Sequence, residues 1–259
     1  MDLGINQRSA IVCASSRGLG EACATSLARE GVRVFINGRH QDALDGAALR
    51  IEKVTGQRPV TVKADITTEE GRERLIAACS SADILINNNA GPAPGILEDW
   101  DRAVWLAALD SNMLAPILLI RAVLPGMRKR RFGRIVNITS AMVKSPAPGM
   151  GLSTAARTGL TALCKSISHE AAADNVTINN LLPERIDTDR QRFMAERMMQ
   201  EQGITLDEAR RQIAESLSAK RFGLPGEFAD ACAFLCSAQA GFISGQNVQI
   251  DGGSYRGLI

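Results

Sequence analysis

The stretch "CASSRGLGEA", residues 13–22, decides the fold that we predict for this chain. It overlaps the apolar run "SAIVCA" (9–14) and leads into "LGEACATSLARE" (19–30), whose apolar residues recur with a helical period of about 3.6. Gly18 and Gly20 therefore stand between an expected strand and an expected helix, as a dinucleotide-binding turn requires. Missing side chains let the backbone approach a pyrophosphate, and the helix N-terminus supplies N–H donors and positive potential. We predict a nucleotide phosphate site at this turn.

The rest of the chain continues the same alternation of strand and helix. Six more short, branched apolar runs follow, at 32–37, 59–64, 83–87, 133–139, 176–182 and 247–251. Longer segments with helical periodicity separate them. This alternation predicts one α/β domain over 1–259, a doubly wound, Rossmann-like parallel sheet of seven strands with helices on both faces. Such sheets bind ligands beyond the carboxyl ends of their strands.

Composition excludes several function classes. A formal net charge of +2 over 259 residues predicts neither a nucleic-acid-binding nor a membrane-binding face. No run of 18 apolar residues and no secretory signal pattern is present, so we expect a cytoplasmic protein.

Cysteine and histidine usage gives no sign of a metal site. The six cysteines form no Cys-x-x-Cys pair and lie in apolar patterns, which predicts reduced, buried thiols. His40 and His169 stand alone without ligand spacing, so we predict no bound metal.

The end of the second expected strand, "FINGRH" (35–40), bears on cofactor choice. NAD-preferring folds place an acidic residue there to bind the ribose 2′-hydroxyl. This chain has Asn37, Gly38 and Arg39 instead, with Arg17 in the glycine turn. Two guanidiniums suit a 2′-phosphate, so we predict NADP(H) in preference to NAD. The alternative is that Arg39 is only a solvated loop charge.

With these features the chain resembles the short-chain dehydrogenase/reductase family from about Gln7 to the "DGG" at 251–253. The closing stretches "RFGLPGEFADACAFLCS" and "GQNVQIDGG" are similar to those of bacterial 3-oxoacyl-carrier-protein reductases. Asp65 in "KADI" matches the family's adenine-contacting acid, and "NNNAG" (87–91) its sheet-stabilising motif. The resemblance, together with the glycine turn, implies cofactor contacts from Ala14, Ser16, Arg17, Gly18, Leu19, Gly20, Asn37, Arg39, Asp65, Ile66, Asn88, Ala90, Arg157, Ile186 and Thr188.

The resemblance also places the catalytic positions. Asn112 in "LDSNML" corresponds to the family's catalytic asparagine and Ser140 in "NITSA" to its catalytic serine. The loop "LLPERIDTD" resembles the family's Pro-Gly-x-x-x-Thr loop, with Glu184 in place of the glycine.

The family's Tyr-x-x-x-Lys pair is replaced. Thirteen residues beyond Ser140 the chain has Ser153, and four further on it has Arg157. The single tyrosine, Tyr255, lies far away near the C-terminus. The implied catalytic set is therefore Asn112, Ser140, Ser153 and Arg157.

This replacement removes the usual proton source. A serine hydroxyl is far less acidic than a phenol, and arginine, with a pKa of roughly 12.5 or higher, does not relay protons readily. Three interpretations stay open: a reductase of a ketone or 3-oxoacyl-like carbonyl whose proton comes from a bound water; an NADP(H)-binding sensor or subunit without turnover; and a lyase like the halohydrin dehalogenases. The last group retains its tyrosine and fills the nucleotide site with bulky residues, whereas this chain keeps Gly18 and Gly20.

Two further expectations concern substrate and assembly. The helical insertion at 189–220 matches the family's substrate lid, and Phe193, Met194 and Met198 either pack it on the core or cover an apolar substrate. Small-residue and leucine faces at about 100–128 and 153–173 resemble the family's dimer-forming helices, which implies a homodimer or homotetramer. A partner's Tyr255 could then approach the site, or it is a simple surface or interface residue.

Overall fold

In the computed structural model, which describes residues 1–258, seven strands form one parallel sheet in the order β3-β2-β1-β4-β5-β6-β7. The strands are β1 (Ser9–Val12), β2 (Arg33–Gly38), β3 (Val60–Lys63), β4 (Ile84–Asn87), β5 (Gly133–Ile138), β6 (Val176–Pro183) and β7 (Asn247–Ile250). Each coincides with one of the apolar runs in the sequence to within one or two residues, so the predicted doubly wound sheet is confirmed. The strand order reverses direction between β1 and β4, and ligands of such sheets bind at this switch point.

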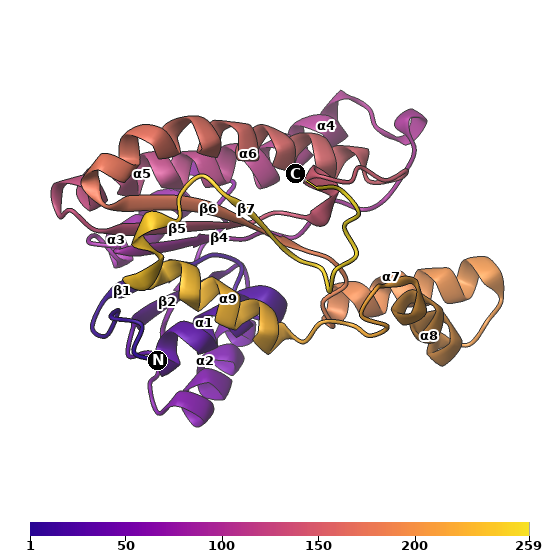
Figure 1. The fold of residues 1–259 in the computed structure, drawn as a ribbon, viewed down its shortest axis with the longest axis horizontal. Coiled ribbons are helices and arrows are strands. Elements are labelled where there is room, and N and C mark those ends of the chain that lie inside the picture. Colours follow the sequence, from indigo (N-terminus) through magenta and orange to yellow (C-terminus); the bar gives the residue numbers. More distant parts are fainter. Residues whose placement is uncertain (259) are drawn as a thin grey trace.

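Helices cover both faces of the sheet (Figure 1). They are α1 (Gly18–Arg29), α2 (Gln41–Thr55), α3 (Glu69–Ala78), α4 (Arg102–Leu109), α5 (Ala115–Lys129), α6 (Gly151–Ala171), α7 (Asp189–Gln202), α8 (Leu206–Ser216) and α9 (Pro225–Cys236). Helices α1, α2 and α9 lie on one face and α3, α5 and α6 on the other, and each layer encloses its own apolar cluster. Short 3₁₀ turns lie at Leu97–Asp99, Ala141–Val143, Ala172–Asp174 and Gln239–Phe242, and a π-helical turn at Asp110–Leu114.

Four asparagines in register tie together the strands on one side of the switch point. The Nδ2 of Asn87 donates to Oδ1 of Asn137 at 2.9 Å, and Asn137 donates in the same way to Asn180 at 2.9 Å. Asn180 in turn donates to Oδ1 of Asn247 at 2.8 Å. Buried amides are tolerated in a sheet when they are paired like this. The ladder fixes the relative heights of β4, β5, β6 and β7, and therefore of the loops that follow β4, β5 and β6.

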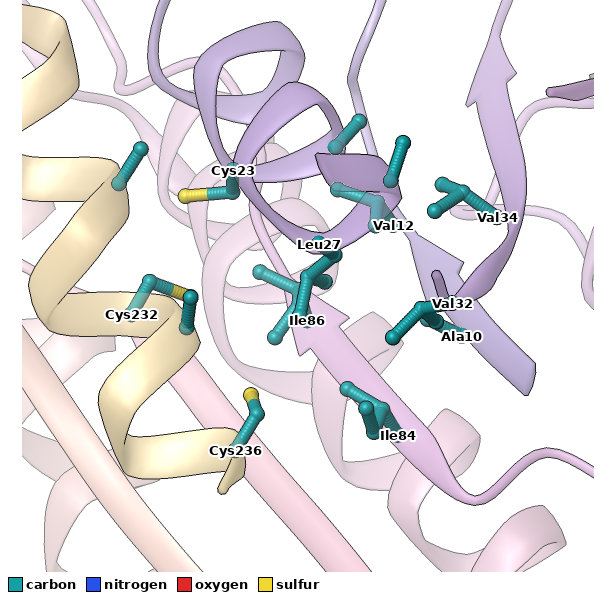
Figure 2. Packing of buried hydrophobic residues seen from close by; sticks show 14 of the residues in the cluster. Ala10, Val12, Cys23, Leu27, Val32, Val34, Ile84, Ile86, Cys232 and Cys236 are labelled. Carbon is teal, nitrogen blue, oxygen red and sulfur yellow. The ribbon is translucent and has the colours of Figure 1, made fainter. Parts of the chain in front are cut away.

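The six cysteines are buried and free, as predicted from their apolar surroundings. Figure 2 shows Cys23 of α1 and Cys232 of α9 turned toward one another, with Cys236 one turn further along α9. Burial raises the pKa of Cys13, at the end of β1, to about 12. Thiols held protonated in this way are inert packing groups.

The segment 189–220 forms two helices, α7 and α8, which project from the end of the sheet (Figure 1). Gly203, with φ +66°, ends α7 in the left-handed conformation that favours glycine. Ala195, Ala209 and Ile213 form a small apolar core between the two helices. The predicted insertion is therefore a helical hairpin with packing of its own.

One helical run passes the length and hydropathy test for crossing a membrane. Among residues 1–258 this is Arg102–Lys129, 28 residues long with 33% of its most apolar window buried. The π-helical turn joins α4 and α5 into this run, which lies where the sequence predicts a helical face at about 100–128. Core helices pass the same test, and Leu119, Ile120 and Met127 of α5 are packed into the core here. The length and composition of this helical run therefore do not by themselves indicate a membrane-spanning segment.

Candidate active site

The glycine turn lies at the carboxyl end of β1 and leads directly into α1. Ala14 and Gly18 adopt positive φ values of 44° and 61°. A Cβ on Gly20 would lie 2.4 Å from the carbonyl oxygen of Ala14 and 2.9 Å from Nδ2 of Asn88. Asn88 donates from that Nδ2 to the same carbonyl at 3.1 Å. The turn is thus closed so tightly that only glycine fits at position 20.

The first turn of α1 keeps its N–H groups available. Within the described residues Arg17, the N-cap residue, makes no side-chain capping bond. The first N–H groups of a helix have no partner inside the helix and favour an anion. Leu19 packs on the apolar cluster beneath, which anchors the helix start. The residues present therefore suit the pyrophosphate of a dinucleotide.

Two of the residues predicted to contact the cofactor, Asn37 and Arg39, lie at the end of β2. One has a structural role, and the other is exposed. Asn37 is buried, and its Nδ2 donates to the carbonyl oxygens of Val62 and Ala64 at 3.1 and 3.0 Å. Its amide thus joins β2 to the end of β3 inside the fold. Arg39 is exposed immediately beyond it.

Asp65 lies beside Arg39. Desolvation acts to raise the pKa of Asp65, but hydrogen bonds from Thr67 and the charge of Arg39 outweigh it and lower the pKa. Thr67 donates to Oδ1 of Asp65 from its backbone N–H at 3.0 Å and from its hydroxyl at 2.7 Å. Ile66 is buried next to it. These residues form the rim where the sequence places the adenosine end of the cofactor.

Two further arginines lie at the glycine turn. Arg17 forms an exposed ion pair with Asp189 of the lid at 3.6 Å. Arg50 of α2 donates to the carbonyl oxygen of Ser16 at 3.2 Å and pairs with Glu21 at 2.7 Å. Sequence reasoning missed Arg50, because a position inside a helix gives no local sign that its side chain reaches a distant turn.

Asn88, Asn89 and Ala90 form the loop after β4. Asn89 donates from Nδ2 to the carbonyl oxygen of Ser111 at 3.0 Å and accepts at Oδ1 from the N–H of Ala90 at 2.9 Å. Asn87 belongs to the asparagine ladder, whereas Asn88 holds the glycine turn. The structure thus separates the roles of three consecutive asparagines that look alike in the sequence.

Ser153 and Arg157 lie one turn apart on α6. Nε of Arg157 donates to Oγ of Ser153 at 3.2 Å. Its Nη1 donates to the carbonyl oxygen of Ile138 at 2.7 Å, and its Nη2 to that of Asn89 at 3.3 Å. Burial, and to a smaller extent the charge of Arg190, lowers the pKa of Arg157 to about 10. The guanidinium stays charged near neutral pH and ties α6 to the ends of β4 and β5.

Asn112 lies in the π-helical turn, which packs against α6. Its Nδ2 donates to Oγ of Ser111 at 2.7 Å. Its Oδ1 is buried and has no hydrogen-bond partner among the described residues. A buried acceptor without a partner costs about 1–3 kcal/mol, so a water or ligand donor is expected there.

Ser140 follows β5 and faces a cleft of about 590 Å³. Its Oγ accepts from the N–H of Met142 at 3.2 Å, which leaves the hydroxyl proton free to donate elsewhere. The cleft is bounded by the proline-containing loops at 94–99 and 147–150, by the loop after β6 and by the lid. Ser153, only 4% exposed, does not line it.

The predicted lid residues lie on different sides of α7. Met194 and Met198 line the cleft, whereas Phe193 is 46% exposed and carries the guanidinium of Arg190 over its ring at 5.6 Å. Thr188, just before α7, lies beside the glycine turn. A Cβ added to Gly18 would lie 3.9 Å from the Cγ2 of Thr188. Ile186 is buried and bridges to Gly223. The hairpin of α7 and α8 therefore starts beside the glycine turn, and its residues line the cleft.

Comparison with known proteins identifies the family. Residues 13–255 match the family model described as enoyl-(acyl carrier protein) reductase. The chain is 36% identical to dehydrogenase/reductase SDR family member 4 of Bos taurus, with 96% of this chain and 88% of that protein covered. It is 30% identical to the NADPH-dependent reductase BacG of Bacillus subtilis strain 168, with 98% and 100% covered. The chain belongs to the short-chain dehydrogenase/reductase family.

Solved structures agree with this assignment. L-sorbose reductase from Gluconobacter frateurii, crystallised with NADPH and L-sorbose, superposes with a TM-score of 0.94 at 28% identity over all of both chains. YwfH, an NADPH-dependent reductase involved in bacilysin biosynthesis, superposes with a TM-score of 0.91 at 30% identity over 98% and 100% of the two chains. The glycine turn and the cleft beside Ser140 are thus features of a short-chain dehydrogenase/reductase, and the chain is an oxidoreductase by family.

Proposed function

We propose that the protein is an NADP(H)-dependent oxidoreductase that reduces a ketone or 3-oxoacyl-like carbonyl group, or oxidises the corresponding alcohol. The observation that carries this proposal is the closed turn at Gly20, which leads into the start of α1 at the same sheet edge as the cleft lined by Ser140. When bound, the nicotinamide supplies a hydride to the carbonyl carbon. Two relatives whose names specify NADPH support this choice of cofactor.

The preference for NADP(H) over NAD rests on arginines near the adenosine end. Arg39 is close enough to Asp65 to lower the pKa of that carboxyl, and Arg17 is exposed at the glycine turn. Guanidiniums bind phosphate oxygens through pairs of N–H groups. Arg50 adds a third cation beside Ser16, although Glu21 neutralises part of its charge.

The chemical centre is atypical, because serine and arginine stand where the family has tyrosine and lysine. Ser140 is placed to donate a hydrogen bond from its hydroxyl group to the substrate carbonyl oxygen and so to stabilise the negative charge that develops there. Arg157 holds the loops after β4 and β5 and supplies positive potential. Asn112 offers a buried acceptor to an ordered water. Ser153, closed off from the cleft, is a partner of Arg157.

The lid and the subunit arrangement follow from exposed apolar groups. Met194 and Met198 are flexible side chains suited to covering an apolar part of the substrate. Leu106 of α4 and Leu114 of the π-helical turn are each 40% exposed. We infer that the faces of α4, α5 and α6 pair in a homodimer or homotetramer.

A second candidate is an NADP(H)-binding protein without turnover. The specific observation in its favour is the burial of Ser153, which leaves the position of the family's tyrosine without a group that reaches the cleft. Oxidation of NADPH at the 340 nm band (about the absorbance maximum of reduced nicotinamide) distinguishes the two, with a panel of 3-oxoacyl thioesters and ketones. Turnover that is abolished in Ser140→Ala supports the reductase. Tight NADPH binding without turnover of any carbonyl supports the second candidate.

A further inference from the structure

Glu184 is the first residue after β6, at the same edge of the sheet as Ser140. Ile138 of β5 pairs with Leu181 of β6, so Ser140 and Glu184 lie two and three residues beyond this pair on neighbouring strands. Adjacent parallel strands lie about 4.8 Å apart. The N–H of Glu184 donates to the carbonyl oxygen of Ile250 at 3.0 Å, which fixes its backbone. Both Ser140 and Glu184 line the cleft.

The carboxyl group of Glu184 is largely shielded from solvent. Its side chain is 17% exposed, and Oε1 lies 3.2 Å from Nε of Arg185. Burial raises the pKa of Glu184, the charge of Arg185 acts to lower it and the charge of Asp251 acts to raise it, and the net direction is upward. The other charged residues that line the cleft are Asp99, Arg190, Arg197 and Glu201. A raised pKa increases the fraction of protonated carboxyl near neutral pH.

The other carboxyl and imidazole groups near the cleft are exposed or lie outside its lining. Asp99 and Glu201 are exposed, and Glu201 is paired with Arg197 of the same helix. Arg157 is buried away from the cleft lining and has a pKa of about 10. His40 lies at the start of α2, and neither it nor His169 of α6 lines the cleft. Glu184 is therefore the shielded acid that faces the same space as Ser140.

We propose that Glu184 is the general acid and base of this active site and takes over the proton transfer that the family assigns to its missing tyrosine. The inference rests on the proposed oxidoreductase function. In reduction, the hydride adds to the carbonyl carbon, the C=O π bond breaks, and the oxygen takes a proton from the Glu184 carboxyl, directly or through one water. The Glu184 carboxylate, paired with Arg185, regains its proton from solvent water. In alcohol oxidation the same carboxylate accepts the proton.

Kinetics of Glu184→Gln test this assignment. We expect kcat for reduction to fall by about 10²–10⁴-fold, the usual contribution of a positioned acid or base. We expect the Kd for NADPH to stay within about twofold of the wild-type value. Wild-type kcat/KM for reduction should fall as the pH rises through the pKa of Glu184, and the variant should lose this dependence. Glu184→Asp keeps a carboxyl and should retain the pH dependence at a lower rate.

A matched control and a direct titration complete the experiment. Glu196→Gln makes the same change on α7, away from the cleft, at a residue paired with Arg192, and should leave kcat unchanged. In protein labelled with ¹³C-glutamate, the carboxyl resonance that disappears in Glu184→Gln should titrate above the ordinary glutamate pKa. Arg185→Gln should raise that pKa further, because Arg185 is the charge that lowers it.

The outcomes separate this inference from the proposed function. Wild-type kcat with an unchanged pH profile in Glu184→Gln overturns the inference alone, and so does a Glu184 resonance that titrates at or below the ordinary value. A loss of NADPH affinity with normal pH dependence assigns Glu184 to cofactor binding and also overturns it. If the wild-type protein reduces no carbonyl in the panel, the proposed function fails first, and the role of Glu184 fails with it.

Discussion

Arg157 donates to Oγ of Ser153 at 3.2 Å across one turn of α6, and the two side chains are only 7% and 4% exposed. The same guanidinium reaches the carbonyl oxygens of Ile138 and Asn89. Ser153 and Arg157 therefore act as a buried clamp between α6 and the loops after β4 and β5. Ser140 and Glu184, beside the clamp, are the polar groups that face the cleft from the ends of β5 and β6.

Removing the clamp should destabilise the fold. Arg157→Met leaves the buried carbonyl oxygen of Ile138 without this donor, at about 1–3 kcal/mol, and removes a donor from the half-buried carbonyl oxygen of Asn89. We expect the midpoint of thermal unfolding to fall by roughly 2–4 °C per kcal/mol for a chain of this size. Arg192→Met, at an exposed pair with Glu196 on the lid, is the control and should change stability by less than about 0.5 kcal/mol. Equal unfolding midpoints for Arg157→Met and the wild type would show that the clamp contributes nothing.

Gly20→Ala should abolish NADPH binding. The added Cβ would lie 2.4 Å from the carbonyl oxygen of Ala14, so the turn has to open and the first N–H groups of α1 lose their alignment. Gly226→Ala, in the first turn of α9, places a Cβ with no atom within 4 Å and is the control. Isothermal titration with NADPH measures both variants. If Gly20→Ala bound NADPH with wild-type affinity, the cofactor phosphates could not lie at this turn.

Arg39→Asp should reverse the cofactor preference. A carboxylate there repels a 2′-phosphate and accepts hydrogen bonds from a ribose hydroxyl. We expect NADPH affinity to fall by about tenfold or more, equivalent to about 1.4 kcal/mol, with NADH affinity unchanged or higher. Arg29→Asp, at the far end of α1, changes the net charge equally and should leave the ratio of the two affinities unaltered. If Arg39→Asp left the ratio of NADPH to NADH affinity unchanged, Arg39 would be only a solvated loop charge.

Glu184→Gln should change the pH dependence of stability. Because the folded-state pKa of Glu184 is raised, its contribution to stability is fully present below the unfolded-state pKa and is lost as the pH rises through the folded-state pKa. The variant lacks this loss. Its unfolding midpoint relative to the wild type should therefore be higher at about pH 7.5 than at about pH 4. The opposite trend would mean that Arg185 outweighs burial and holds the carboxyl ionised.

Leu106→Glu should weaken self-association. Leu106 is 40% exposed on α4, in the helical run whose apolar window is only 33% buried in one chain. A charge in a paired apolar face costs desolvation energy, so we expect a shift toward monomer in light scattering at micromolar concentration. Leu49→Glu on α2, where Leu49 is 56% exposed, is the control. A wild-type protein that is monomeric under these conditions would refute the proposed assembly.

The fold followed from local patterns, whereas the contacts of the site did not. Strand positions and the glycine turn could be predicted because periodicity and glycine spacing are local properties. The burial of Ser153, the approach of Arg50 to Ser16 and the inward turn of Asn37 depend on which elements pack together. Glu184 was recognised as a departure from the family's loop, but its role needed the strand register that places it beside Ser140.

Transfer of deuterium from NADPH labelled at the nicotinamide C4 position measures the central claim most directly. Mass spectrometry of the alcohol formed from an accepted 3-oxoacyl thioester or ketone should show one deuterium on the former carbonyl carbon, and Ser140→Ala should form little or no labelled product. Saturating, tight NADPH binding with no labelled alcohol from any carbonyl in the panel would contradict the claim that this chain is a working reductase.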